Sequence, residues 1–378
     1  MGGVLEFGRF FDRRIIALER LPRLREWTQS VLSDPLLSLE PASADASFRR
    51  YFRATTPRGS FVVMDAPTSH EDCRPFVHVA RLFREAGANT PEILAENLEE
   101  GFLLLTDFGG TTYLAALNDA SADALYRDAN HALVRIQAAS RPGELPEYDR
   151  DLLLRELRLF PDWYLAKHLK VELGTEQKAV LDTAFEAILA NNLAQLQVYV
   201  HRDWHSRNLM VTERDNPGVL DFQDAVYGPI TYDLASIYKD AYIRWDEERV
   251  LDWVVRYWEA ARQADLPVDR DFGAFYRDFE WMGVQRHIKV LGIFARLGGG
   301  VSRPFSRPAE WRGSAPHLKL RPLSPRLCHR DGKDGYLKDM PLVMDYLRRA
   351  CGRYNGLGDF LRLLDQIEGK AARVGYTF

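Results

Sequence analysis

A run of eight residues in the middle of the chain, 201–208 (HRDWHSRN), gathers side chains suited to phosphoryl transfer. This chemistry needs a carboxylate that orients the attacking hydroxyl and accepts its proton, and oxygen ligands for Mg²⁺ at the phosphates. Asp203 supplies such a carboxylate, Asn208 an amide oxygen, and Asp221 a second carboxylate shortly afterwards. Asp203 is thus a candidate base, and Asn208 and Asp221 are candidate ligands for Mg²⁺.

The same run fits the H-R-D-x-x-x-x-N pattern of the catalytic loop of protein kinases, and Asp221 lies in a Leu-Asp-Phe segment. Similar letters recur elsewhere: residues 107–109 and 271–273 both read DFG, and residues 329–331 read HRD. None of these copies has the rest of the pattern nearby. Spacing therefore favours residues 201–221 as the catalytic set over a solvated polar turn.

The elements before this set indicate a small β-rich lobe. Three strands are expected at 36–39, 48–54 and 60–66, then a helix at 74–86 that ends at a glycine, then a hairpin of strands 92–96 and 101–106. An amphipathic helix is expected over 8–32, ahead of the first strand.

Helical periodicity dominates after residue 110, over 112–139, 151–169, 174–196 and from 231 to the C-terminus. Short strands at 198–200, 209–211 and 219–221 bracket the polar loop. The predicted fold class is α+β, a bilobal protein-kinase-like fold with a small antiparallel-sheet N-lobe and a larger, mainly α-helical C-lobe. We expect the nucleotide-binding lobe at 1–106 and the catalytic and substrate lobe at 107–378, with a loosely held insertion at 298–326, which is rich in proline and basic residues.

The phosphate-binding end departs from the protein-kinase pattern. A protein kinase carries a lysine on its third strand, paired with a glutamate on the next helix. Here Asp65 takes that position, no lysine precedes Lys167, and the helix at 74–86 has no central glutamate. We infer a reversed polarity, in which Asp65 pairs with an arginine of the helix while an arginine of the second strand reaches the phosphates. The helix candidates are Arg74 and Arg81; the strand candidates are Arg49, Arg50 and Arg53, which could equally be ordinary surface residues.

Further site residues are expected around these elements. Backbone groups near Ser43 and Ser47 are candidates for phosphate binding, and Leu105, Thr106 and Asp107 join the lobes where adenine would bind. Asp233 is expected to brace the catalytic loop. Candidate substrate residues are Asp224, Arg286 and His287; the polar run 285–289 that contains the last two is either a pocket wall or the hydrated face of a packed helix.

Composition limits the classes of partner. The formal net charge is −4, so no overall positive field recruits nucleic acid or an anionic membrane. The three scattered cysteines do not form a disulfide framework, and the first residues lack the pattern of a secretory signal. We expect a cytoplasmic protein without a membrane span.

The run HRDWHSRN with PGVLDFQDAVYGPITYDL resembles the aminoglycoside phosphotransferase and choline kinase branch of the protein-kinase-like fold. Within this branch, segments such as SADASFRRYFR, VVMDAP, MGVQRHIKVLGIFARL and CHRDGKDGYL are similar to bacterial anomeric kinases of amino sugars. The resemblance spans about residues 40–350 and departs from the family at 298–326. It implies ATP-dependent phosphorylation of the C1 hydroxyl of N-acetylmuramate or N-acetylglucosamine in peptidoglycan recycling, with the product passed to a nucleotidyltransferase.

Two alternatives remain open from the sequence. A kinase of another small alcohol or of an aminoglycoside would share every catalytic residue and differ only in its pocket. A nucleotide-binding pseudokinase would explain the missing lysine and glutamate, but it would have no need of a base and two metal ligands together.

Overall fold

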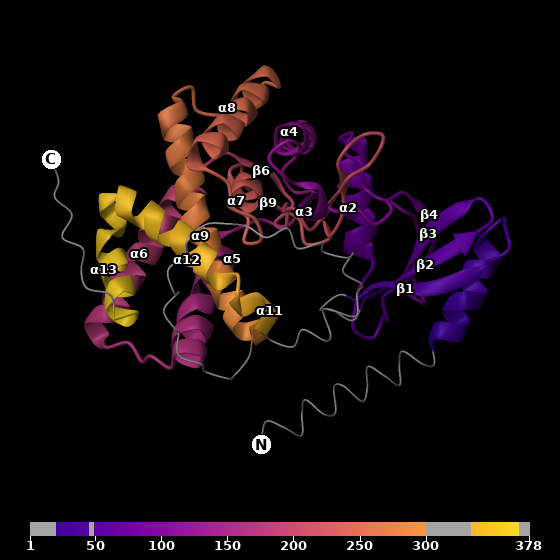
Figure 1. Ribbon diagram of the computed structural model, residues 1–378, viewed down its shortest axis with the longest axis horizontal. Coiled ribbons are helices and arrows are strands. Elements are labelled where there is room, and N and C mark those ends of the chain that lie inside the picture. Colours follow the sequence, from indigo (N-terminus) through magenta and orange to yellow (C-terminus); the bar gives the residue numbers. More distant parts are fainter. Residues whose placement is uncertain (1–19, 45–48, 299–333, 370–378) are drawn as a thin grey trace.

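The computed structural model describes residues 20–44, 49–298 and 334–369 of the chain (Figure 1). Its first part is a five-stranded antiparallel sheet in the order β1-β2-β3-β5-β4. The strands are β1 (Ser38–Ala44), β2 (Arg50–Thr56), β3 (Gly59–Asp65), β4 (Ile93–Asn97) and β5 (Phe102–Thr106), with helix α2 (Arg74–Glu85) between β3 and β4. The predicted order of strand, strand, strand, helix, strand, strand is confirmed.

The sheet is covered on both faces, as the alternation of its side chains requires. One face, including Phe52, Val63 and Leu104, forms a small core with Leu24 of a helix over residues 20–31. The other face joins the main core, in which α2 also takes part. The predicted N-terminal helix at 8–32 is therefore present from residue 20, and its earlier part lies outside the described residues.

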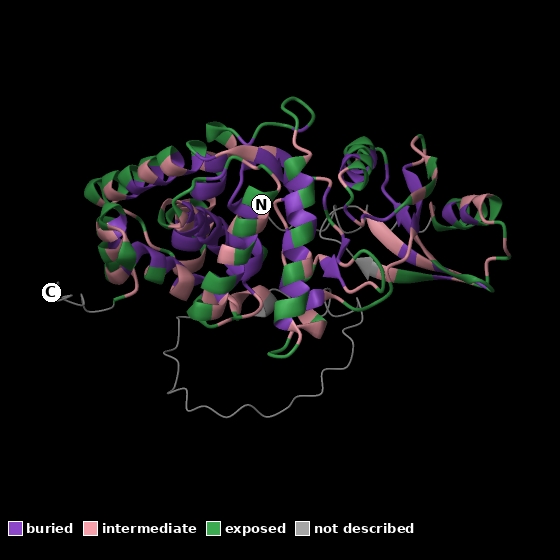
Figure 2. Cartoon of the chain, turned by 90° about the horizontal axis from the view of Figure 1, so that it is seen from above, coloured by how far each residue is buried: buried purple, intermediate pink, exposed green. Residues whose placement is uncertain are grey.

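The second part is mainly helical, and Figure 2 shows its helices with buried inner sides and exposed outer sides. The long helix α9 packs against most of the others, which makes it the centre of this lobe. The helices are α3 (Tyr113–Ala116), α4 (Ala122–Ala138), α5 (Arg150–Leu159), α6 (Thr175–Leu193), α7 (Tyr232–Tyr238), α8 (Glu247–Gln263), α9 (Phe272–Gly298), α11 (Asp334–Leu337), α12 (Met340–Arg353) and α13 (Gly358–Ile367), with a 3₁₀ turn η2 (Asn355–Leu357).

The predicted helix at 151–169 changes type along its length: after α5 the chain continues as a π-helix, η1 (Phe160–Leu169). Helix α9 lies very close to this change, because a Cβ built at Gly292 would stand 2.5 Å from the carbonyl carbon of Leu159. Only glycine fits that approach without a shift of the backbone.

Four short strands frame the catalytic loop: β6 (Gln197–Val200) pairs with β9 (Val226–Pro229), and β7 (Leu209–Met210) pairs with β8 (Gly218–Val219). In the view of Figure 1, β6, β9 and α7 lie between α2 and α9. The sequence analysis missed β9, since its residues Val-Tyr-Gly-Pro carry no strand signal. Gly228 permits the pairing there, because a Cβ at this position would lie 2.6 Å from the Cβ of Tyr148.

Three expectations fall on residues that are not described. They are the segment around Ser47, the HRD copy at 329–331 and the insertion predicted at 298–326, of which only Gly298 is described, as the last residue of α9. No helix in the described part of the chain is long and apolar enough to cross a membrane.

Candidate active site

The catalytic loop is held by one buried carboxylate from the start of α7. Asp233 accepts the backbone N–H of His201 at 2.7 Å and that of Arg202 at 3.0 Å. Arg202 has a φ of 75°, a left-handed conformation. This conformation is costly for a residue other than glycine and persists only where the surrounding structure holds it. The predicted role of Asp233 as a brace is confirmed.

His201 connects the loop to the segment that carries Asp221. Its Nε2 lies 3.0 Å from the carbonyl oxygen of Leu220, and its Nδ1 accepts the N–H of Asp203 at 3.2 Å. A carbonyl only accepts, so the ring is neutral with its proton on Nε2. Burial lowers the pKa of His201 to about 4, which keeps the ring in this form at neutral pH.

The structure brings the three residues of the predicted catalytic set together. Asn208 donates from Nδ2 to the carbonyl oxygen of Asp203 at 3.0 Å and to Oδ2 of Asp221 at 3.3 Å. Gln223 donates to Oδ1 of Asp221 at 2.8 Å. Asp221 itself has a φ of 63°, so both Arg202 and Asp221 adopt the left-handed conformation on either side of the site.

These residues fit a hard divalent cation. Because the nitrogen of the Asn208 amide is occupied, its oxygen is the atom left to face a metal beside the Asp221 carboxylate. The described residues contain no group of three or more His, Cys, Asp and Glu side chains that could hold a metal. Two protein oxygens completed by phosphates and water are the usual way in which proteins bind Mg²⁺.

Asp203 stands in a positive environment. Burial favours its neutral form, but the nearby positive charges, of which that of Lys289 is the largest and that of Arg286 another, outweigh burial and lower the pKa of Asp203. Lys289 is itself fixed, with Nζ 2.9 Å from Oε1 of Glu156 and 2.8 Å from the hydroxyl of Tyr232. The Asp203 carboxylate is therefore ionised at neutral pH and can accept a proton.

The interpretation of 285–289 as a hydrated helix face is wrong, since Gln285, Arg286, His287 and Lys289 are all buried. These side chains face other elements of the helical lobe, and some of them form hydrogen bonds or ion pairs there. Gln285 donates to the carbonyl oxygen of Leu153 at 3.0 Å, and Lys289 pairs with Glu156.

Glu156 is a site residue that the sequence analysis missed. It pairs with Lys289 and with Arg202, and it accepts the hydroxyl of Tyr148. A signal was present: Glu156 occupies the same face of its helix as Leu153, Leu157 and Phe160, all buried. An acid within an apolar stripe indicates a buried partner.

Removing the positive charge of Lys289 should move the acid limb of the pH–rate profile to higher pH. Lys289 is the largest charge that lowers the pKa of Asp203, so Lys289→Met is expected to raise that pKa and to require a higher pH for an ionised base. The measurement is kcat/KM against pH for the wild type and the variant. An acid limb that stays in place would contradict the coupling between these two residues.

The pairing proposed for Asp65 is corrected. Its carboxylate binds Arg20 at 2.7 Å and Arg50, not Arg74 or Arg81. Strand register places Arg50 directly opposite Asp65, and Arg20 reaches it from the helix over residues 20–31. Arg74 and Arg81 point to solvent and pair with Asp72 and Glu96.

The other candidate nucleotide residues are spread over the sheet. Arg53 binds Asp107 at 2.6 Å and the carbonyl oxygen of Gly109 at 3.0 Å, so its guanidinium links β2 to the segment that follows β5. Leu105 and Thr106 pair with β3, and Thr106 also exchanges hydrogen bonds with Glu92. The backbone of Ser43 pairs with Tyr51 in β1 and β2. Arg49 lies 3.8 Å from Glu71 and is largely buried.

The candidate substrate residues differ in their distance from the loop. The carbonyl oxygen of Asp224 accepts from Arg202 at 3.4 Å, which places Asp224 at the edge of the site. The ring of His287 stacks on Tyr346 at 5.3 Å and its Nε2 lies 3.4 Å from the carbonyl oxygen of Lys239, so it packs away from the catalytic loop. Arg286 is buried near Asp203.

A small sheet joined to a helical lobe, with Asp203, Asn208 and Asp221 brought together beside it, is the arrangement of a kinase-like phosphotransferase. The sequence model of the phosphotransferase enzyme family matches residues 38–273, and the chain belongs to this family. The chain is 45% identical over 367 residues to the N-acetylmuramate/N-acetylglucosamine kinase of Neisseria meningitidis, covering 96% of this chain and 100% of that protein.

Two further comparisons agree. The protein of the same name from Pseudomonas aeruginosa is 45% identical, with 92% of this chain and 97% of that protein covered. Among solved structures, amicoumacin kinase hAmiN in complex with AMP-PNP and Ca²⁺ superposes with a TM-score of 0.54 at 12% identity, covering 87% of this chain and 96% of that chain. At this identity the last match supports the fold alone.

Proposed function

We propose that this chain is an ATP-dependent sugar kinase that phosphorylates the C1 hydroxyl of N-acetylmuramate and N-acetylglucosamine. The observation that carries the proposal is the meeting of Asp203, Asn208 and Asp221 in one site within a chain that matches kinases of that name over nearly its whole length. The intact set argues against a pseudokinase. In this proposal residues 1–106 bind nucleotide and residues 107–378 carry catalysis and the substrate.

Asp203 orients the anomeric hydroxyl and accepts its proton as the hydroxyl oxygen bonds to the γ-phosphorus of ATP and the bond from that phosphorus to the leaving ADP breaks. An anomeric hydroxyl is more acidic than an ordinary alcohol, so a carboxylate with a lowered pKa is a sufficient acceptor when it is well positioned. The hydrogen bonds of Asp233 and His201 to the loop backbone hold that position.

ATP supplies the phosphoryl group, and Mg²⁺ would be held by Asn208 and Asp221. When bound, the metal neutralises charge on the phosphates. The hydrogen bond from Gln223 fixes the Asp221 carboxylate in its orientation. Thr106 and its neighbours at the lobe junction are proposed to contact adenine.

Arg49 is the arginine that we propose for phosphate binding, since Arg50 and Arg53 are held at hydrogen-bond distance by Asp65 and Asp107, whereas Arg49 lies 3.8 Å from Glu71. Arg49→Ala should raise the KM for ATP by about 10-fold, because a hydrogen bond to a charged group contributes about 1.5–3 kcal/mol. The matched control is Arg58→Ala, whose exposed side chain pairs with Asp34 at 2.6 Å. If Arg49→Ala leaves ATP affinity unchanged, the phosphate role of Arg49 is wrong.

The reaction is proposed to take place in the cytoplasm, where ATP is available. Its product, a sugar 1-phosphate, is a substrate for a nucleotidyltransferase, which we propose as the next enzyme in the recycling of peptidoglycan sugars.

The function is tested by ³¹P NMR of the purified protein with Mg-ATP and one acceptor at a time: N-acetylmuramate, N-acetylglucosamine, an aminoglycoside and choline. A sugar 1-phosphate signal with the first two acceptors only is the expected result. Phosphorylation of the aminoglycoside or choline alone would replace the proposal with a kinase of that acceptor. ATP binding without turnover of any acceptor would indicate a pseudokinase.

A further inference from the structure

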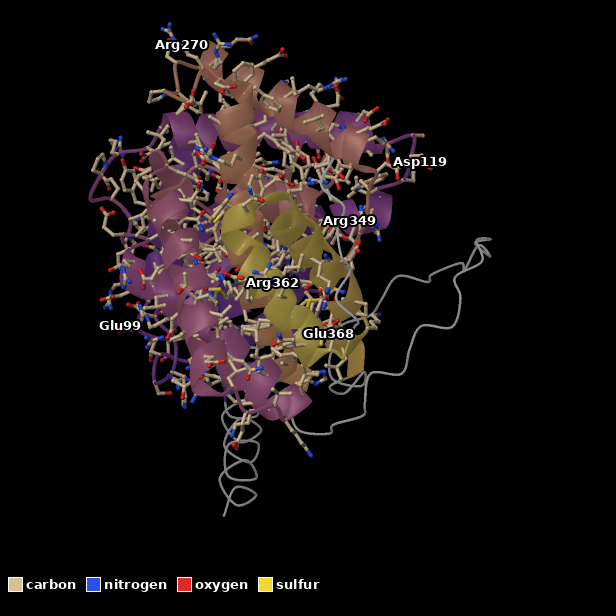
Figure 3. All side chains as sticks on the ribbon, turned by 90° about the vertical axis from the view of Figure 1, so that its left-hand side faces the viewer. Glu99, Asp119, Arg270, Arg349, Arg362 and Glu368 are labelled. Carbon is tan, nitrogen blue, oxygen red and sulfur yellow. The ribbon has the colours of Figure 1, made fainter. Side chains whose placement is uncertain are left out.

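Arg286 is a buried guanidinium that forms no ion pair with any described residue. It is 5% exposed, and its Nη1 has no hydrogen-bond partner among the described residues. Arginine cannot lose its charge in a protein, and a buried charge is costly unless it is paired. Arg349 and Arg362, labelled in Figure 3, are instead exposed and pair with Asp345 and Asp359.

The acids around Arg286 are already occupied. Both oxygens of Asp233 accept backbone N–H groups of the catalytic loop. Asp240 accepts from the backbone and hydroxyl of Ser206 at 3.0 and 2.6 Å and from the N–H of Tyr242 at 3.1 Å. Asp203 is the proposed base. No carboxylate in the part of the chain that the structure describes therefore forms an ion pair with Arg286.

Arg286 stands about one helical turn before Lys289 on α9, and Lys289 pairs with Glu156, which also binds Arg202 next to Asp203. The charge of Arg286 acts on Asp203 and also on Tyr242, which follows α7. The ring of Tyr242 meets the ring of His205 edge-on at 5.6 Å, and the guanidinium of Arg207 stands 3.6 Å from its centroid. Aromatic rings and arginines next to a base suit a sugar that carries a negative charge, and they do not suit a polycation.

From this we infer that Arg286 receives the carboxylate of N-acetylmuramate. The assignment rests on the proposed function and adds to it a residue that distinguishes the two sugars. N-acetylmuramate differs from N-acetylglucosamine by a lactyl ether on C3, which ends in a carboxylate. A guanidinium binds a carboxylate through two parallel hydrogen bonds, and the sugar would supply a counterion that Arg286 does not find among residues 20–44, 49–298 and 334–369.

The test compares kcat/KM for the two sugars in the wild type, Arg286→Gln and Arg286→Lys. In Arg286→Gln the ratio of kcat/KM for N-acetylmuramate over N-acetylglucosamine should fall by at least about 10-fold, since truncating one partner of a buried charge pair has a large effect on binding. Arg286→Lys should recover part of the ratio. Arg256→Gln is the matched control, because its exposed side chain pairs with Asp252 on α8.

If the ratio falls by less than about 10-fold, the assignment is wrong, whether the variant loses activity equally with both sugars or with neither. An equal loss would indicate a role in positioning Asp203 or in binding ATP. A second measurement needs no variant: the wild type is given N-acetylmuramate and its neutral methyl ester. The ester should have a KM at least about 10-fold higher, and equal KM values would overturn the assignment. Turnover of N-acetylglucosamine in the same assay shows separately whether the proposed function holds.

Discussion

Replacing Asp203 with asparagine is expected to lower kcat by about 10²–10⁴-fold, the usual contribution of a positioned general base. The amide has the same shape as the carboxylate but cannot take the proton of the sugar hydroxyl. The backbone of Asp203, which accepts from Asn208 and donates to His201, is unchanged by the substitution. The KM for ATP and the melting temperature should therefore stay close to those of the wild type.

The measurement is steady-state turnover with N-acetylglucosamine and Mg-ATP, together with ATP binding. The chain offers a matched control in Asp271→Asn, which alters an exposed aspartate in another DFG segment, where it only caps the N–H of Gly273. That variant should keep its activity. A loss of activity in Asp271→Asn comparable to that in Asp203→Asn would contradict the choice of residues 201–221 as the catalytic set.

Replacing Glu156 with glutamine is expected to reduce the free energy of unfolding by about 3–5 kcal/mol, the usual cost of breaking a buried ion pair. Glu156 is 5% exposed and pairs with both Lys289 and Arg202. Without its charge, two cations remain buried close together. Because Arg202 adjoins Asp203, activity should fall as well.

Urea denaturation at several pH values measures this effect. Burial would raise the pKa of Glu156, but Lys289 and Arg202 outweigh burial and lower it. A carboxyl with a lowered pKa stabilises the fold above its unfolded-state pKa, about 4.3, and this stabilisation is lost as the pH falls through the folded-state value. The difference between wild type and variant should thus be largest near neutral pH and should shrink in acid.

Glu186→Gln is the matched control for this experiment. Glu186 also pairs with an arginine, Arg150, but both side chains are exposed by about half, so the change should cost less than about 1 kcal/mol. Equal losses in the free energy of unfolding in the two variants would show that burial does not increase the contribution of the Glu156 ion pairs to stability.

The meeting of Asp203, Asn208 and Asp221 and the order of the sheet could be predicted from the sequence because their signals are local. Asp203 and Asn208 lie on one short loop, so the chain itself limits how far apart they are. Strand β2 alternates in burial along its length, and that alternation is visible in its residues. Strand β9 carried no such pattern, since glycine and proline fill half of it, and its pairing with β6 was missed.

Which charges pair was decided only by the tertiary structure. Asp65 was expected to bind the following helix, yet its partners are Arg20, from the helix over residues 20–31, and Arg50, across the strand pair. Lys289 was taken as part of a run that could be hydrated, yet Glu156 of a distant helix holds it in the core. The sequence by itself determined the chemistry available to this protein, because spacing along a loop is a short-range property. Counterions and burial depend on residues far apart in the chain. Only the packing of α5, α7 and α9 around the loop therefore decided that Glu156 binds both Lys289 and Arg202, and that the charge of Lys289 acts on Asp203.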